Sequence, residues 1–230
     1  MINAIRKYND IDLVMFDFVT ADEYGNVTKD GYYKYKYNNN FSLISGRQFL
    51  TSHEAPWGPW LYLYRTAFLQ DNHFRFEENV RFEDIDFVMR CTANAKEITF
   101  IPSPAITHTE SEYQTSAIGN SSEKIIDFLK LIYRTGLVAK EEFDKGHYDS
   151  GQAILQHHIF GYKNQLKTYL WRLGYSDLYD SLTKYPPLLC NNDMVLSFIA
   201  NHPRLSTILL KGATPALRSV YYFYRLAKSQ

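Results

Sequence analysis

Two adjacent carboxylates, Glu83 and Asp84, are the residues of this sequence whose placement most favours catalysis. They open a stretch without proline or glycine in which Ile85, Val88 and Met89 recur at helical spacing. A carboxylate in the first turn of a helix faces the positive end of the helix dipole, which keeps it ionised and able to accept a proton. Acidic residues are also favoured there as simple caps. The pair alone therefore supports either a general base or a cap.

The sequence around this pair contains four short segments rich in aromatic and charged residues. They are Ala55-Pro56-Trp57-Gly58-Pro59-Trp60, Leu63-Tyr64-Arg65-Thr66-Ala67-Phe68-Leu69, Phe74-Arg75-Phe76-Glu77-Glu78 and Phe82-Glu83-Asp84-Ile85-Asp86-Phe87. In this order and spacing they resemble the acceptor side of the family 2 glycosyltransferases of bacterial polysaccharide assembly. Segments 12–17, 45–50 and 98–102 agree with the same resemblance, which covers residues 10–118.

The resemblance implies roles for five residues. Asp84, in a catalytic pair with Glu83, is implied to be the general base that takes the proton of the acceptor hydroxyl in an inverting transfer. Trp57 and Tyr64 are implied to bind substrate, Trp57 by stacking on a sugar ring. We expect the guanidinium fork of Arg65 to hold Glu83 or a diphosphate oxygen, with a surface ion pair as the alternative.

Trp60 and His108 are weaker candidates. Trp60 stands beside Leu61 and Leu63, so we expect it to pack in the core rather than against a sugar. His108 lies where some relatives place a histidine that helps to bind a metal or a diphosphate. A histidine that only satisfies its hydrogen bonds is the more common case.

The motifs with which the family binds its donor do not precede Asp12. Family members carry a nucleotide-binding unit, an Asp pair and a metal-binding Asp-x-Asp motif, whereas residues 1–9 resemble the end of the helix that follows that motif. The Asp-x-Asp triplets at 10–12 and 84–86 stand in the wrong places to replace it. We therefore expect an acceptor-side half, inactive alone. Activity would need a donor-binding half, a sugar nucleotide and a divalent metal, Mn or Mg.

The two parts of the chain differ in their patterns. Residues 1–118 carry short β-type runs with turn signals, and residues 119–230 carry helical patterns, so a boundary is expected near residues 119–122. The expected fold class is α/β. It would be a partial GT-A (Rossmann-like) sheet half followed by an α-helical C-terminal region.

Individual elements follow from the same patterns. Residues 13–19 are typical of a strand covered on both faces, and the loss of a donor half would leave its edge unpaired. Turn signals at 24–32 favour a hairpin or excursion, and a strand at 98–101 is expected to end before Pro104. Helices are expected at 83–95, 123–135, 149–173 and 177–184, and from Pro203 to Lys211 and Pro215 to Ala227.

The composition excludes several classes of protein. Lys plus Arg equals Asp plus Glu, 25 each, so the chain lacks the net charge of a general nucleic-acid binder. Two cysteines without a C-x-x-C pair argue against a disulfide framework and a zinc site, and favour a reducing compartment, the cytoplasm. No apolar run fits a signal peptide or a spanning helix. The 16% aromatic content, with 19 Tyr, suits sugar binding or packing.

The C-terminal segment 194–230 is basic and aromatic. It contains five cations and no acid, against 20 basic and 25 acidic residues before it. A basic amphipathic helix binds anionic lipid, and an ordinary solvated helix face explains the charge equally well. Peripheral contact with the inner membrane face is the expectation in the first case.

Two functions remain at this stage. The preferred one is a glycosyltransferase, or a fragment of one, that transfers a sugar to a polysaccharide or lipid-linked acceptor. The alternative is a non-catalytic acceptor-binding or assembly module without a donor site. The partners expected are the sugar acceptor and either a second copy of the chain or a separate donor-binding half.

Overall fold

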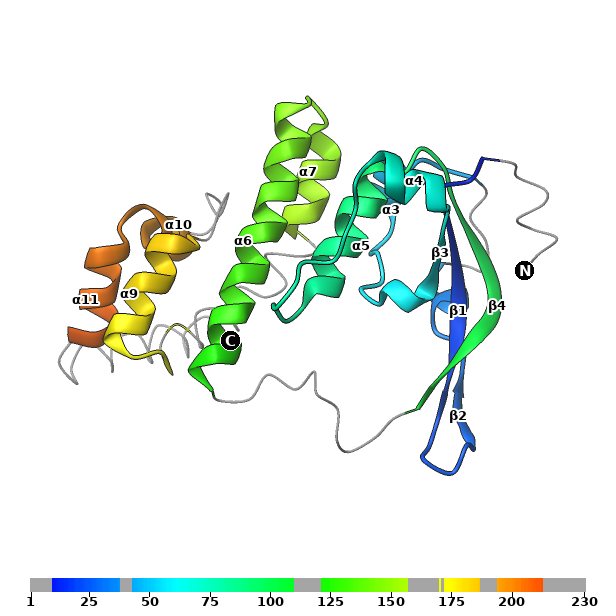
Figure 1. Ribbon diagram of the computed structural model, residues 1–230, viewed down its shortest axis with the longest axis horizontal. Coiled ribbons are helices and arrows are strands. Elements are labelled where there is room, and N and C mark those ends of the chain that lie inside the picture. Colours follow the sequence, from blue (N-terminus) through cyan, green and yellow to red (C-terminus); the bar gives the residue numbers. More distant parts are fainter. Residues whose placement is uncertain are drawn as a thin grey trace, which may run out of the picture.

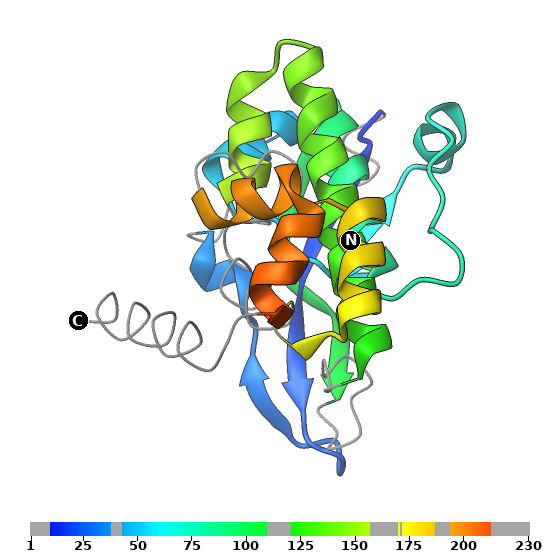
Figure 2. The ribbon, with the colours of Figure 1, turned by 90° about the vertical axis from the view of Figure 1, so that its left-hand side faces the viewer.

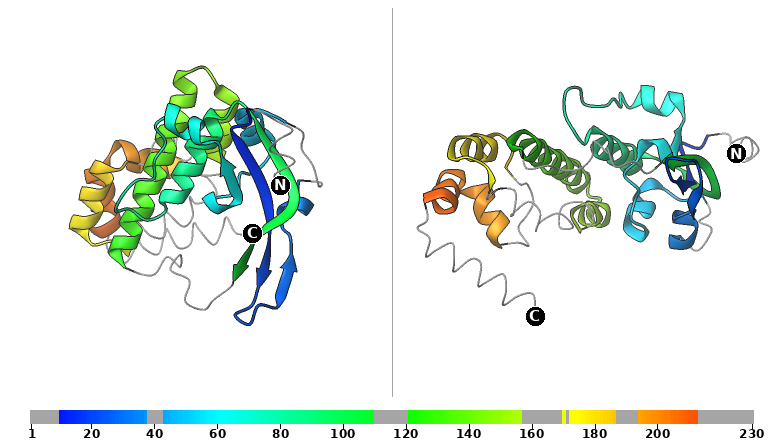
Figure 3. Two further views of the ribbon diagram at one scale, coloured as in Figure 1. Left: turned by 45° about the vertical axis from the view of Figure 1, so that its right-hand side comes forward. Right: turned by 90° about the horizontal axis from the view of Figure 1, so that it is seen from below.

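The structure is a computed structural model that describes residues 10–37, 43–109, 121–156, 170, 172–186 and 194–212. A small mixed sheet is followed along the chain by helices (Figure 1). Figures 2 and 3 show the same order in space, with the helices α9 (Tyr175–Lys184), α10 (Met194–Asn201) and α11 (Pro203–Gly212) on the side of α6 (Ser122–Asp144) away from the sheet. Within the described ranges, no helix combines the length and the apolar character that crossing a membrane requires.

The central strand of the sheet is β1 (Leu13–Ala21). On one side it pairs in parallel with β4 (Ile98–Thr109), and on the other it pairs antiparallel with β2 (Val27–Asp30) and β3 (Tyr62–Tyr64). The apolar run correctly predicted a strand covered on both faces. The expectation of an unpaired edge at 13–19 was wrong for residues 13–15, which pair with β3 on one side and β4 on the other, and for Val19, which pairs with β2 and β4. Among the described residues, 16–18 pair with β4 alone.

β4 is longer than the sequence predicted. The strand passes Pro104 and ends at Thr109, and its register against β1 shifts on either side of Asp17. Among the described residues, β4 has no further strand on its other side apart from a bridge between Ile44 and Ile98. A proline at such an edge, beside a register shift, removes no necessary ladder bond, so Pro104 did not end the strand.

β1 and β2 form the expected hairpin. Asp22 organises its turn by accepting hydrogen bonds from the backbone N–H groups of Tyr24 and Asn26, at 3.0 and 2.8 Å. A short helix, α2 (Tyr33–Lys36), follows and was not predicted. The buried carboxylate of Asp17 accepts the backbone N–H groups of Tyr32 and Tyr33 at 2.9 and 3.0 Å, which fixes the start of α2 against β1.

The helix that begins with the Glu-Asp pair, α5 (Glu83–Asn94), packs beside the sheet against α3 (Gly46–Ser52). α3 begins with a capping box between Ser45 and Gln48. At Gly46 the two helices approach so closely that a Cβ would lie 1.7 Å from the carbonyl oxygen of Thr92. The short elements η1 (Pro59–Leu61) and α4 (Thr66–Asp71) lie between them in the chain.

The C-terminal helices only partly follow the predicted bounds. They are α6 (Ser122–Asp144), α7 (Tyr148–Ile154), α9 (Tyr175–Lys184), α10 (Met194–Asn201) and α11 (Pro203–Gly212). α5, α9 and α11 confirm the predictions to within two residues, and α10 was not predicted. α6 continues through Gly136, which was expected to end it, because Val138 and Ala139 extend its buried face. Residues 157–169 and 215–227, parts of two predicted helices, lie outside the described residues, as do 1–9 and 110–120.

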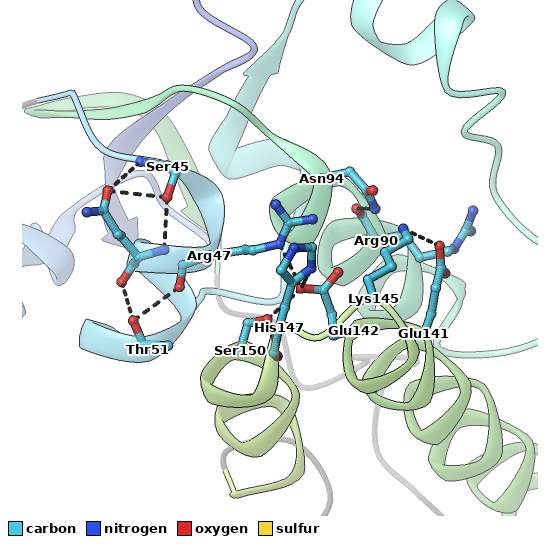
Figure 4. A network of polar contacts seen from close by, with 11 residues as sticks. Ser45, Arg47, Thr51, Arg90, Asn94, Glu141, Glu142, Lys145, His147 and Ser150 are labelled. Atoms are coloured by element: carbon cyan, nitrogen blue, oxygen red, sulfur yellow. Dashed lines mark hydrogen bonds and ion pairs between the residues drawn. The ribbon is translucent and has the colours of Figure 1, made fainter.

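A buried ion pair joins the N-terminal part to the helical part (Figure 4). Nε of Arg47 on α3 donates to the carboxylate of Glu142 on α6 at 2.8 Å, and the hydroxyl of Ser150 on α7 donates to the same oxygen. The Glu142 side chain is only 2% exposed. Burial raises the pKa of Glu142, but its hydrogen bonds with Arg47 and Ser150 outweigh that effect and leave the pKa below its ordinary value.

Candidate active site

The predicted catalytic pair lies at the start of α5. Phe82, the residue before the helix, has left-handed backbone geometry (φ 61°), and Glu83 and Asp84 follow in the first turn. Oδ1 of Asp84 accepts the backbone N–H of Ile85 at 2.9 Å. Burial raises the pKa of Asp84, the Ile85 hydrogen bond opposes the rise, and the charge of Glu83 adds to it. A half-buried carboxylate with a raised pKa is a better proton acceptor than an ordinary surface aspartate.

A third carboxylate of the same turn, Asp86, is in a different state. It is buried, and its Oδ2 accepts Nε and Nη2 of Arg90 at 3.1 and 2.9 Å. Within the described part of the chain, Asp84 has no such cation. Asp84 is therefore the aspartate of this turn whose charge is left uncompensated.

Within the part of the chain that the structure describes, Arg65 forms its ion pair with Asp12 and not with Glu83. Its Nη2 donates to Oδ1 of Asp12 at 2.6 Å, and Oδ2 of Asp12 accepts the backbone N–H of Lys96 at 2.7 Å. Asp12 is buried, so the pair is not the surface ion pair of the alternative prediction either. The observed role of Arg65 is to tie the end of β3 to the segment before β1.

Tyr64 lies against the candidate catalytic helix. Its ring centroid is 5.4 Å from that of Phe87, which is about one turn beyond Asp84 on α5. Burial raises the pKa of the Tyr64 hydroxyl above its ordinary value, and this oxygen has no hydrogen-bond partner among the described residues. The structure thus brings Tyr64 to α5, and its role in substrate binding stays a prediction.

Trp60 and His108 form a stacked pair. Their ring centroids are 5.6 Å apart with an interplanar angle of 16°, and Phe18 packs edge-on against Trp60 at 5.3 Å. Trp60 is 39% exposed, so the prediction that it packs in the core was wrong. The Trp ring is held on the surface of the sheet by β1 and β4 instead of being covered by Leu61 and Leu63.

Trp57 lines a hollow of about 220 Å³ next to the hairpin. Three of the other six wall residues are aromatic, and the six come from three separate segments of chain: Phe18, Tyr32, Tyr33, Lys36, Glu54 and Ala55. At its rim, Nζ of Lys36 donates to Glu54 at 2.7 Å. Aromatic faces beside a charged pair suit a sugar ring, which has both C–H faces and hydroxyl groups.

Neither Glu83 nor Asp84 lines this hollow. The wall residues other than Trp57 were not predicted as site residues, because they are brought together by the hairpin and α2. The run of tyrosines at 32, 33, 35 and 37 was the one sequence signal available for them.

The fold matches that of S. aureus TarS. The crystal structure of TarS 1–349 in complex with UDP covers 98% of this chain at a TM-score of 0.58, with 16% sequence identity. A second crystal structure of TarS 1–349 covers 93% of the chain at a TM-score of 0.54, with 16% identity. A crystal structure of TarS covers 90% of the chain at a TM-score of 0.53, with 17% identity. The chain spans 61% of TarS 1–349 and 35% of TarS.

The likeness to TarS is one of fold. The mixed α/β arrangement described above resembles part of the GT-A fold of this glycosyltransferase. No protein-family profile matches the chain, and no curated protein is significantly similar to it in sequence. At 16% identity, the roles of individual residues rest on the geometry of this chain and not on TarS.

A metal site does not emerge from the residues that the structure describes. They contain no group of three His, Cys, Asp or Glu side chains placed to hold an ion. His108, the predicted ligand, has its ring stacked on Trp60. TarS binds UDP in its crystal structure. In this chain, His108 alone would give a metal ion a single ligand.

Proposed function

We propose that this chain is the acceptor-side part of an inverting glycosyltransferase that uses a sugar nucleotide, with Asp84 as general base. The observation that carries the proposal is the half-buried, uncompensated carboxylate of Asp84 at the start of α5. The fold similarity to UDP-bound TarS supports a nucleotide diphosphate sugar as donor. The donor itself is assigned to a separate donor-binding part, and the divalent metal, Mn or Mg, belongs with it.

The proposed reaction is a single displacement. A carboxylate oxygen of Asp84 takes the proton of the acceptor hydroxyl while the hydroxyl oxygen forms a bond to the anomeric carbon. The bond from that carbon to the diphosphate breaks, and the nucleotide diphosphate leaves with the electron pair. A metal, when bound, neutralises the charge that develops on the leaving group. Tyr64, whose ring contacts Phe87 of α5, is proposed to help bind the substrate.

The acceptor is proposed to be a saccharide, free or lipid-linked. Trp57 supplies a ring for stacking, and the Lys36 and Glu54 side chains provide a donor and an acceptor for sugar hydroxyl groups at the rim of the hollow. The hollow of about 220 Å³ is of the size of one sugar ring rather than a chain of several. A longer acceptor would extend from it over the surface.

The role of Asp84 is tested by measuring sugar transfer by an enzyme that contains the acceptor-side part together with the donor-binding part. We expect Asp84→Asn to lower kcat by 10²-fold to 10⁴-fold, the usual contribution of a general base. The matched control is Asp149→Asn, an exposed aspartate in the first turn of α7, which should leave kcat unchanged. Retention of more than a tenth of kcat by Asp84→Asn would overturn the assignment.

The non-catalytic binding module makes a different prediction. It is favoured by one observation, that the aromatic hollow is lined by Trp57 but not by Asp84. Under that alternative, Trp57→Ala abolishes saccharide binding in a calorimetric titration, while no sugar is transferred by any combination of parts. Transfer that depends on Asp84 excludes it.

A further inference from the structure

A second hollow, of about 380 Å³, lies between α5, α6 and the segment that leads into α5. It shares no wall residue with the hollow at Trp57. Asp86 and Arg90 line it from α5, and successive residues of a helix are about 100° apart. Asp84 therefore points to a different face of α5, and this second hollow is separate from the proposed reaction centre.

Three arginines, three acids and one histidine form the polar wall of this hollow. Arg75, Arg90 and Arg134 line it together with His73, opposite the acids Glu77, Asp86 and Glu141. Two of these acids are already neutralised, because Asp86 binds Arg90 at 2.9 Å and Glu141 binds Lys145 at 2.6 Å. Figure 4 shows the pair of Glu141 and Lys145.

The charges that remain are those of Arg75, Arg134 and Glu77. Neither arginine side chain has an ion pair within the described ranges, although the backbone carbonyl of Arg75 accepts Nη2 of Arg90 at 2.9 Å. Two guanidinium groups thus face a single free carboxylate. The hollow keeps an excess of positive charge without counting His73.

Arg134 is the feature that calls for a ligand. Its Nε and Nη2 atoms are buried and have no hydrogen-bond partner among the described residues. A buried guanidinium nitrogen without an acceptor is costly, and an anion in the hollow removes this cost once the Arg134 side chain turns these two atoms toward it. The fork of an arginine matches two oxygens of a phosphate group.

The rest of the wall is apolar and partly open. Phe76 and Leu137 are 47% and 43% exposed, and Phe76 stacks on Phe87 with ring centroids 4.0 Å apart. A free phosphate ion would leave these surfaces in water. A phosphate that carries an organic group would cover them.

We propose that this hollow binds a phosphate group, held by Arg134 and Arg75, with the organic part of a phosphate ester against Phe76 and Leu137. The site is independent of the proposed transferase reaction, since it uses neither Asp84 nor Trp57. Arg90 stays paired with Asp86 and forms the floor of the site.

Calorimetric titration of the chain with inorganic phosphate and with phenyl phosphate tests the site and distinguishes a free ion from an ester. We expect both to bind, with phenyl phosphate at least tenfold tighter. Arg134→Gln should weaken both at least tenfold, and Arg134→Lys should recover part of the loss, because lysine keeps the charge but not the fork. Equal affinity for the two probes would identify a free phosphate as the ligand and still support the site.

Two further variants keep the test decisive. Arg75→Gln changes an exposed side chain, so it should fold normally and weaken phosphate binding. Lys140→Gln, on the same helix as Arg134 but paired with Asp144 and outside the hollow, is the matched control and should bind phosphate as the unchanged chain does. The proposal is overturned if the chain does not bind phenyl phosphate at 10 mM (roughly ten times a millimolar Kd), or if Arg134→Gln and Lys140→Gln bind it equally.

Discussion

Replacing Glu142 by glutamine should weaken the connection between the sheet and the C-terminal helices. The carboxylate is 2% exposed and is shared by Arg47 of α3 and Ser150 of α7. Glutamine has nearly the same volume and keeps one oxygen, so it fills the site but removes the charge. α3, α6 and α7 would remain packed by their apolar faces, which isolates the polar contribution.

The size of the effect follows from the exposure of the partners. Hydrogen bonds to a charged group contribute about 1.5–3 kcal/mol each, and breaking a buried ion pair costs about 3–5 kcal/mol. Arg47 is 37% exposed and regains water when its partner is lost, so the lower end of that range applies. We expect Glu142→Gln to lower the free energy of unfolding by about 3 kcal/mol.

Urea unfolding followed by circular dichroism measures this loss. The control is Asp144→Asn, two residues further along α6, whose pair with Lys140 is 62% and 53% exposed and should contribute no more than about 0.5 kcal/mol. In a double-mutant cycle, Arg47→Gln and Glu142→Gln should be strongly non-additive. If Glu142→Gln costs no more than Asp144→Asn, the buried pair does not hold these elements together.

The same variant carries a pH signature. The pKa of Glu142 is lower in the folded chain than in the unfolded one, so the unfolded state binds more protons as the pH falls. The stability that the carboxylate contributes is therefore complete above the unfolded pKa of glutamate and is lost as the pH falls through the folded pKa. The difference in unfolding free energy between the unchanged chain and Glu142→Gln should shrink below about pH 4.3, the usual pKa of glutamate. A difference that is constant from pH 7 to pH 3 would contradict this account.

Three further predictions concern the sheet and the α3–α5 contact. Asp17→Ala should lower the unfolding free energy by about 3 kcal/mol or more, measured in urea, because three backbone N–H groups lose their acceptor. Gly46→Ala should lower it by at least about 1–3 kcal/mol, since its Cβ would meet the carbonyl oxygen of Thr92; a neutral effect would show that α3 moves away freely. Cys91 is buried, and burial raises its pKa to about 12, so in a Cys190→Ser background the folded chain should not react with a disulfide reagent at pH 8 until denaturant is added.

The regular elements were predictable where a local pattern decided them. The helical spacing of Ile85, Val88 and Met89 predicted α5, and the apolar run at 13–19 predicted β1. The errors at Gly136 and Pro104 share a cause. Gly136 disfavours a helix locally, but the buried face of α6 stabilises the helix on both sides of it. Pro104 disfavours a strand locally, but at the edge position of β4 its missing N–H group costs no necessary hydrogen bond.

The partners of the site residues were less predictable, because they come from distant parts of the sequence. Arg65 pairs with Asp12, which is 53 residues away in the sequence, and not with the pair Glu83 and Asp84, which is nearer in the sequence. Trp57 lines the same hollow as Phe18 and Tyr33, which the hairpin and α2 bring next to it. The residue types predicted a site with aromatic and charged side chains. Which of the charged side chains form ion pairs with one another depends on the three-dimensional arrangement.

The motif Glu-Asp-x-Asp shows why that pairing matters for function. In sequence, Asp84 and Asp86 are equivalent acidic residues of one helical turn. In the structure, Asp86 is buried against Arg90, and its Oδ2 accepts both Nε and Nη2 of that arginine. Asp84 receives only the N–H of its neighbour and has its pKa raised by burial. The pair with Asp86 holds Arg90 in the wall of the second hollow, whereas Asp84 has no cation among the described residues, which is why the proposed general base is Asp84 and not Asp86.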